Sequence, residues 1–212
     1  MIENKIGKIE NIIDKDTVGY LLTKFEALPK KDNGLRINAD TLVDQDFNKK
    51  FNEKITEILM PHFKGHVNHA TIYSDYHPGG IHSDGWMDKP EQNKLAYTFL
   101  IPLQSEYEKN ATIVFEETSE EAVTYNQATG LGQKGVASYQ QTALPDADHF
   151  IDADTQNKWF PHLNEEKLPF RIAEVLTWEV GTALYWPRIN LHASAWFPSD
   201  SNRKAMVILT NE

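Results

Sequence analysis

The sequence contains no cysteine in its 212 residues. This absence excludes disulfide bonds, thiolate nucleophiles, zinc ribbons and iron–sulfur clusters, because each of these needs cysteine sulfur. Any metal site in this protein must therefore be built from nitrogen and oxygen ligands.

Positive charge is also scarce, since 21 lysines and arginines stand against 31 aspartates and glutamates, for a formal net charge of -10. Such a balance repels a nucleic-acid backbone instead of displacing its counterions. We therefore expect a small-molecule or peptide substrate and no nucleic-acid partner. The oligomeric state has no signal in the sequence.

Long hydrophobic runs are missing as well, because no stretch of 18 consecutive apolar residues occurs. The segment Met1–Lys5 carries charges of both signs and does not resemble the start of a signal peptide. We expect a soluble, unexported protein of the cytoplasm that makes no membrane contact. The 40% of hydrophobic residues is enough for one sizeable core, which predicts a single domain over 1–212.

The first sixty residues look helical, and we expect residues 1–64 to form a helical support. A weaker helix is predicted over Thr17–Leu28, with Asp16 as its N-cap and Pro29 closing it. A clearer helix ends at Pro61 and has large apolar residues at the spacing of one helical face, namely Phe47, Phe51, Ile55, Ile58 and Leu59.

From Val67 onward the pattern changes to short runs rich in β-branched and aromatic residues, separated by turn sequences. These runs predict strands at Val67–Tyr76, Lys94–Leu103, Ala111–Phe115, Ile172–Val180, Thr182–Trp186, Leu191–Phe197 and Lys204–Thr210. No helices are expected between most of them, so the fold class is α+β, mainly β: an antiparallel sandwich or barrel over 67–210 with the helices packed on one sheet. The polar stretch 117–170 is too long for a simple connection and is interpreted as an insertion or lid.

A histidine and an aspartate stand two residues apart in the segment Ile81–Gly85. In an extended strand, residues i and i+2 project from the same face, so His82 and Asp84 can reach one ion. A lone His-x-Asp pair is common by chance, and the plainer interpretation is a pair that satisfies local hydrogen bonds.

Two residues far along the chain strengthen the metal hypothesis. His192 lies in a strand-like run that can return it to the same pocket, and two histidines with one carboxylate bind one face of a ferrous ion while leaving positions open. Arg203 opens the apolar strand that follows, where a buried guanidinium can grip a carboxylate with two hydrogen bonds. The alternatives are a core histidine for His192 and a structural ion pair for Arg203.

With the segment Gly181–Trp186 before the distal histidine, these four residues resemble the motifs of the Fe(II)/2-oxoglutarate-dependent dioxygenase family, particularly its prolyl 4-hydroxylase-like branch. The resemblance spans about Val67–Thr210. It implies a double-stranded β-helix, or jelly roll, with iron bound by His82, Asp84 and His192. It also implies 2-oxoglutarate as co-substrate, held at one end by Arg203, and O₂ as oxidant. The implied reaction is hydroxylation of a C–H bond with release of succinate and CO₂.

The resemblance also points to two tyrosines. Tyr73 matches a tyrosine that contacts the co-substrate in this branch, and Tyr97 falls where a relative's hydroxyl pairs with the arginine. On residue type alone, both tyrosines are equally well explained as core residues of strands. The sequence differs from the branch at Asn110–Phe115 and at Arg203, where the prolyl hydroxylases proper usually carry lysine. These differences concern substrate specificity rather than cofactor chemistry.

A second class of function must be kept beside the enzyme, because a fold does not determine a function. A cupin-like or lectin-like jelly roll would bind a metal or ligand without oxidising anything. Arg203 separates the two hypotheses, since a binding module has no need of a carboxylate clamp close after a ligand histidine. A catalytically inactive family member is a third possibility, against which the intact ligand set argues.

Overall fold

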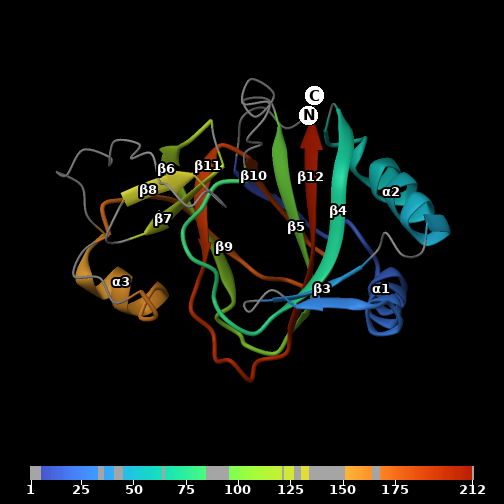
Figure 1. Cartoon of the computed structure of the whole chain (residues 1–212), viewed down its shortest axis with the longest axis horizontal. Helices are drawn as coiled ribbons and strands as arrows, with labels where there is room; N and C mark the ends of the chain where they lie inside the picture. The colour runs from blue at the N-terminus through green and yellow to red at the C-terminus, as the bar shows by residue number, and fades with distance from the viewer. Residues whose placement is uncertain are drawn as a thin grey trace.

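Two antiparallel sheets face each other, and two helices cover the outer face of the larger sheet (Figure 1). The computed structural model describes residues 6–32, 36–40, 45–63, 65–84, 96–120, 122–126, 130–133, 151–163 and 168–211. This arrangement is the predicted jelly roll with N-terminal helices packed on one sheet, so the predicted fold class is confirmed.

The larger sheet has seven strands, and each pairs antiparallel with its neighbour. In spatial order they are β1 (Gly7–Ile9), β10 (Ala183–Pro187), β5 (Tyr97–Ser105), β12 (Arg203–Asn211), β4 (His66–Asp75), β3 (Arg36–Ala39) and β2 (Lys30–Asp32). The smaller sheet has the order β11 (Asn190–Ser194), β6 (Ala111–Thr118) and β9 (Ile172–Thr177), and a separate hairpin is formed by β7 (Val123–Asn126) and β8 (Gly130–Gln133).

The two faces of the larger sheet serve different cores, because successive side chains of a strand point to opposite sides. Ile72 of β4 and Phe99 of β5 belong to the core beneath the helices. Their neighbours Tyr73 and Leu100 belong to the core between the two sheets, where they meet Val114 of the smaller sheet. A residue's position along a strand therefore decides whether it faces the helices or the interior of the jelly roll.

The two predicted helices are present. Helix α2 (Gln45–Leu59) buries the predicted apolar face, and Pro61 follows its end. Helix α1 (Lys15–Ala27) begins earlier than expected, because its N-cap is Asp14 and not Asp16. The Asp14 carboxylate accepts a hydrogen bond from the backbone N–H of Thr17 at 2.7 Å, which places Asp16 inside the first turn.

The expectation that the first sixty residues are helical throughout is wrong. Strands β1, β2 and β3 lie in this region and extend both edges of the larger sheet. Each has only three or four residues, and β1 pairs with β10 near the other end of the chain. Strands this short carry no readable alternation, and partners far away in the sequence leave no local signal.

The predicted insertion at 117–170 contains the β7–β8 hairpin and helix α3 (Ala153–Trp159). Residues from this region, including Val123 and Phe160, pack with Phe115 and Leu191 of the smaller sheet. Residues 134–150 lie outside the described part of the chain, and a lid function for this region stays a prediction. Among the described helices, none is long and apolar enough to cross a membrane.

Candidate metal centre and co-substrate pocket

His82 and His192 are brought together by backbone pairing. His82 follows β4 and forms an isolated bridge with His192 of β11. The N–H of His82 donates to the carbonyl oxygen of His192 at 3.0 Å, and the reverse hydrogen bond measures 2.8 Å. The register between β11 and β6 shifts just before His192, where the Asn190 amide donates to the Phe115 carbonyl at 2.8 Å. Such an irregularity changes the direction of the side chain that follows it.

Both imidazole rings are oriented by carbonyl groups of their own segments. The Nδ1 atom of His82 lies 2.8 Å from the Gly80 carbonyl oxygen, and the Nδ1 atom of His192 lies 3.1 Å from that of Asn190. A carbonyl oxygen can only accept a hydrogen bond, so each Nδ1 must carry the proton. Each Nε2 then keeps the lone pair that a metal needs.

The third member of the cluster is Asp84, whose carboxylate faces both rings. Its oxygens lie 3.8 Å from Nε2 of His82 and 3.3 Å from Nε2 of His192. The three ligand atoms all lie within 4.8 Å of one another. Two imidazole nitrogens and one carboxylate on one side of a common point form the donor set of a facial non-haem iron site, so the residues present fit Fe(II).

Asp84 is held by two residues that were not assigned a role from the sequence. The hydroxyl of Thr98 donates to Oδ2 of Asp84 at 2.8 Å. Arg188 is 1% exposed and donates to the backbone carbonyl of Asp84 from Nε at 3.0 Å and from Nη2. Burial lowers the pKa of Arg188 to about 10, an effect that the charge of Asp84 opposes. No local sequence signal distinguishes these residues, because their function depends on long-range pairing.

Arg203 is the first residue of β12, as predicted, and only 1% of it is exposed. Its guanidinium lies over the rings of Trp178 and Phe197, with its carbon 3.7 Å and 4.4 Å from their centroids. Nη2 donates to the hydroxyl of Ser194 at 3.4 Å. Among the described residues, Nη1 and Nε are buried without a hydrogen-bond partner, although Nε faces the Asp75 carboxylate at 3.7 Å. A buried guanidinium with unsatisfied N–H groups fits a carboxylate ligand.

A row of three charged residues crosses the larger sheet at this position. Arg36 of β3 is in register with Asp75 of β4, which is in register with Arg203 of β12. Oδ1 of Asp75 lies 3.1 Å from Nε of Arg36, and Oδ2 lies 3.7 Å from Nε of Arg203. Burial raises the pKa of Asp75, while the two arginines act to lower it. The structural ion pair considered for Arg203 is therefore present, but it occupies only one edge of the guanidinium.

The two predicted tyrosines lie on opposite faces of the sheet. Tyr73 faces the interior, and the Arg36 guanidinium lies over its ring at 4.3 Å. Burial raises the pKa of Tyr73, so its hydroxyl stays neutral and can donate. Tyr97 instead lies in the core beneath the helices, with its ring 6.0 Å from that of Phe63. The sheet therefore does not bring Tyr97 to the metal centre, because its neighbour Thr98 occupies the inward-facing position of β5.

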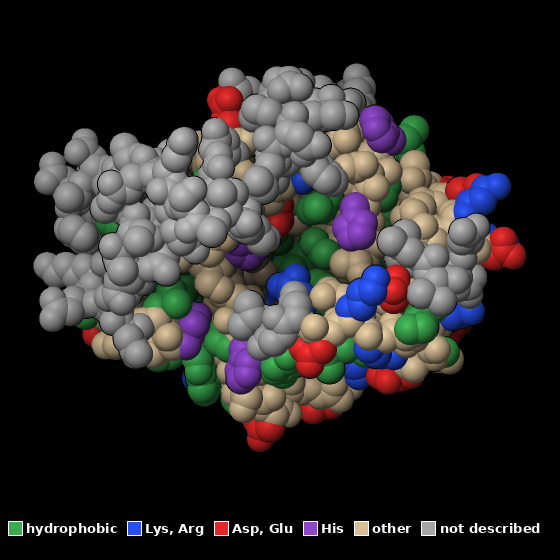
Figure 2. Space-filling model, in the orientation of Figure 1, with side chains coloured by type: hydrophobic (Ala, Val, Ile, Leu, Met, Phe, Trp, Pro, Cys, Tyr) green, Lys and Arg blue, Asp and Glu red, His purple; other side chains and the backbone are tan. Residues whose placement is uncertain are grey.

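A cavity of about 40 Å³ adjoins the ligand cluster between the two sheets. Figure 2 shows this side of the molecule hollowed near its centre, where basic, histidine and hydrophobic side chains gather. The cavity is lined by the three ligands and by Arg36, Tyr73, Thr98, Leu100, Thr112, Trp186, Ala193, Ser194 and Val207. Ser194 also accepts the hydrogen bond from Arg203, so the cavity connects the metal ligands to the surroundings of the arginine.

Comparison with solved structures gives the fold a class. The carbocyclase SnoK, described as non-haem and α-ketoglutarate-dependent, superposes with a TM-score of 0.57 at 12% identity, covering 99% of this chain and 81% of SnoK. HygX from Streptomyces hygroscopicus, solved with nickel, 2-oxoglutarate and hygromycin B, gives 0.56 at 8% identity, with 97% and 82% covered. EctD from S. alaskensis, solved with 2-oxoglutarate and 5-hydroxyectoine, gives 0.55 at 12% identity, with 98% and 72% covered.

The chain therefore has the fold of the 2-oxoglutarate- and Fe(II)-dependent oxygenases. No protein-family model and no curated protein matches its sequence. At these identities the likeness concerns the fold alone, and the chemistry must be argued from the side chains described above.

Proposed function

We propose that this protein is an Fe(II)- and 2-oxoglutarate-dependent dioxygenase whose metal ligands are His82, Asp84 and His192. The observation that carries the proposal is the convergence of these ligand atoms within 4.8 Å of one another, in a cavity that adjoins a buried arginine with unsatisfied N–H groups. A jelly roll that only binds a metal has no use for such a guanidinium, which makes the binding-module alternative the weaker one.

The side chains around the cavity have distinct tasks in this proposal. Arg203, which donates to the cavity-lining residue Ser194, binds the distal carboxylate of 2-oxoglutarate. The neutral Tyr73 hydroxyl is a hydrogen-bond donor that lines the cavity itself. Thr98 and Arg188 keep the Asp84 carboxylate directed at the metal. When bound, the ferrous ion and 2-oxoglutarate use O₂ for an oxidative decarboxylation to succinate and CO₂, coupled to oxidation of a substrate C–H bond.

The substrate belongs to the small-molecule class in this proposal, with hydroxylation as the outcome. The HygX structure holds hygromycin B and the EctD structure holds 5-hydroxyectoine, and these two small ligands support the assignment. Placement in the prolyl 4-hydroxylase-like branch is supported by the order of the motifs from Tyr73 to Arg203 and remains part of the proposal.

Anaerobic titration with Fe(II) and 2-oxoglutarate tests the function directly. Chelation of ferrous iron by the keto acid is expected to give a weak metal-to-ligand charge-transfer band in the visible spectrum. Asp84→Ala should lose this band. Asp154→Ala, an exposed aspartate in the first turn of α3, should keep it.

Succinate release on admission of air provides the second readout, with candidate small molecules compared for their ability to increase it. A protein that binds iron tightly but shows neither the band nor any succinate would be the metal-binding jelly roll of the alternative hypothesis. Succinate formed equally by the wild type and Asp84→Ala would come from a contaminant, and the proposal would then be without support.

A further inference from the structure

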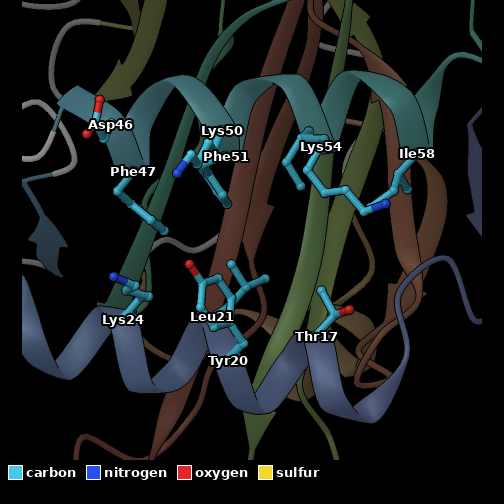
Figure 3. A pocket seen from close by; sticks show the side chains of 11 residues that line it. Thr17, Tyr20, Leu21, Lys24, Asp46, Phe47, Lys50, Phe51, Lys54 and Ile58 are labelled. Carbon is cyan, nitrogen blue, oxygen red and sulfur yellow. The ribbon is translucent and has the colours of Figure 1, made fainter.

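A groove of about 570 Å³ runs between α1 and α2, on the face of the larger sheet away from the metal centre. Figure 3 shows the two helices side by side, with side chains of both pointing into the space between them. The residues that line it lie between Thr17 and Lys24 on α1 and between Asp46 and Ile58 on α2, so the groove follows both helices. Nothing in the proposed oxygenase reaction uses it.

The bottom of the groove is apolar. Three residues line it that also belong to the core beneath the helices, namely Leu21 of α1 and Phe51 and Ile55 of α2. Phe47 stacks on Phe51 with ring centroids 5.3 Å apart, and Tyr20 on the opposite helix is 54% exposed. A volume between about 300 and 1,000 Å³ with mainly hydrophobic and aromatic walls is characteristic of small-molecule sites.

The polar groups of the groove are mostly cationic, although the whole chain carries a net charge of -10. Lys24, Lys50 and Lys54 line it, against the single acidic residue Asp46. The Lys24 ammonium lies 5.3 Å from the ring centre of Phe47, which holds the charge over the aromatic wall. Lys54 lies 3.1 Å from Glu57, which does not line the groove.

Lys50 differs from the other two lysines. Within the described residues it has no hydrogen bond, ion pair or aromatic partner, and Figure 3 shows it pointing into the groove from α2. Lys49, its neighbour in the sequence, does not line the groove and lies 4.0 Å from Glu53. This face of α2 therefore offers an ammonium group that has no ion-pair partner among the described residues and lies beside an apolar surface.

We propose that the groove binds a free amphipathic carboxylate, with an aliphatic or aromatic body of the fatty-acid type. The apolar body would cover Leu21, Phe51 and Ile55, so that burial of its methylene groups favours binding. The carboxylate would lie between Lys50 and Lys24. A short dicarboxylate such as 2-oxoglutarate has no apolar body to cover this floor, so the site is chemically separate from the metal centre.

Displacement of a fluorescent anion measures this binding. The intact protein is mixed with 1-anilinonaphthalene-8-sulfonate and titrated with dodecanoate below its micellar concentration, and with dodecyltrimethylammonium at the same concentrations. Dodecanoate should displace the dye and raise the melting temperature, while the cation of equal chain length should do neither. Equal effects of both would show a surface that selects only for apolar character, and would overturn the proposal.

Matched charge reversals locate the site. Lys50→Glu should weaken dodecanoate binding by roughly fivefold or more, because an attraction is replaced by a repulsion, whereas Lys49→Glu should leave it unchanged. The melting temperature without ligand verifies that both variants are folded. Equal affinities in the two variants would overturn the proposal.

Three other results would overturn it as well. Binding that requires phosphatidylglycerol vesicles would indicate a membrane lipid. A dimer in sedimentation that Lys50→Glu dissociates, without dodecanoate binding, would make the groove an interface between copies of the chain. Capture of an acidic helical peptide in the absence of dodecanoate binding would make it a protein docking site.

Discussion

His82 and His192 lie directly opposite each other in an antiparallel bridge, with both reciprocal backbone hydrogen bonds formed. Their ring centroids are 4.3 Å apart. The positions of these two proposed ligands are thus set by backbone pairing. Asp84 is different, because its carboxylate depends on a side-chain hydrogen bond from Thr98.

Thr98→Val should therefore weaken metal binding while preserving the fold. The two side chains have nearly the same shape, so the change removes the hydrogen bond to Oδ2 of Asp84 and little else. Loss of such a supporting contact typically costs about 10- to 100-fold in metal affinity. Competition with a chromophoric chelator measures the affinity, and Thr98→Ser, which restores a hydroxyl, should recover most of it. Wild-type affinity in the valine variant would remove Thr98 from this role.

Arg203→Ala should abolish tight 2-oxoglutarate binding and leave the metal bound. Truncating one partner of a buried, hydrogen-bonded charge pair costs about 2–5 kcal/mol, which corresponds to a loss of roughly 30-fold or more. Calorimetric titration of the metal-loaded protein measures it. Arg171→Ala is the control, because Arg171 lies about half exposed beside Glu116. A similar co-substrate affinity in both variants would contradict the assignment of Arg203.

Asp75→Asn should destabilise the protein, because the buried guanidinium of Arg203 and the partly exposed one of Arg36 would then share no carboxylate. Breaking a buried ion pair costs about 3–5 kcal/mol of unfolding free energy. Because 2-oxoglutarate would bring a new negative charge to Arg203, it should raise the melting temperature more in this variant than in the wild type. Glu57→Gln breaks the exposed pair with Lys54 and should cost less than about 1 kcal/mol. An equal rise of the melting temperature with 2-oxoglutarate in the wild type and in Asp75→Asn would show that Asp75 and the co-substrate do not share Arg203.

His162 should make stability depend on pH. Burial lowers its pKa to about 4, from the usual 6.5, and both ring nitrogens are buried without hydrogen-bond partners among the described residues. Below about pH 6.5 the unfolded chain binds a proton that the folded chain cannot, so stability falls as the pH decreases toward about 4. The loss should be on the order of 1 kcal/mol, because the ring is only partly buried.

Urea unfolding at about pH 7 and about pH 5 would measure the contribution of His162. His162→Phe keeps an aromatic ring beside Phe160 and should flatten the pH dependence. His66→Phe replaces an exposed histidine and should leave the dependence as in the wild type. Parallel curves for the wild type and His162→Phe would show that another group is responsible.

Much of the jelly roll could be predicted from the sequence because its strands carry dense local signals. The runs Val67–Tyr76 and Lys204–Thr210 correspond closely to β4 and β12. The run Ile172–Val180 was predicted too long, since β9 ends at Thr177 and the chain turns at Gly181, whose φ is +82°. The pairing of β1 with β10 could not be predicted, because it joins segments from opposite ends of the chain.

The metal ligands could be proposed from the sequence, whereas their surroundings could not. His82, Asp84 and His192 follow a motif that residue types and their spacing in the sequence are enough to indicate. Tyr97 and Thr98 show the limit of the sequence motif, because adjacent residues of a strand face opposite sides. Tyr97 faces the helices, whereas Thr98 faces Asp84. Arg36 was missed for another reason, since it lies in a short edge strand within a region predicted to be helical.

Through the row formed by Arg36, Asp75 and Arg203, the N-terminal segment contributes a positive charge beside the proposed co-substrate pocket. Strand β3 lies in the segment that was expected to form a helical support, yet it supplies one of the two positive charges that flank Asp75. A chimera that exchanged residues 1–40 for those of another jelly roll would thus alter the electrostatic potential felt by an acidic ligand. In engineering this fold, its first forty residues and the proposed co-substrate pocket should therefore be exchanged together.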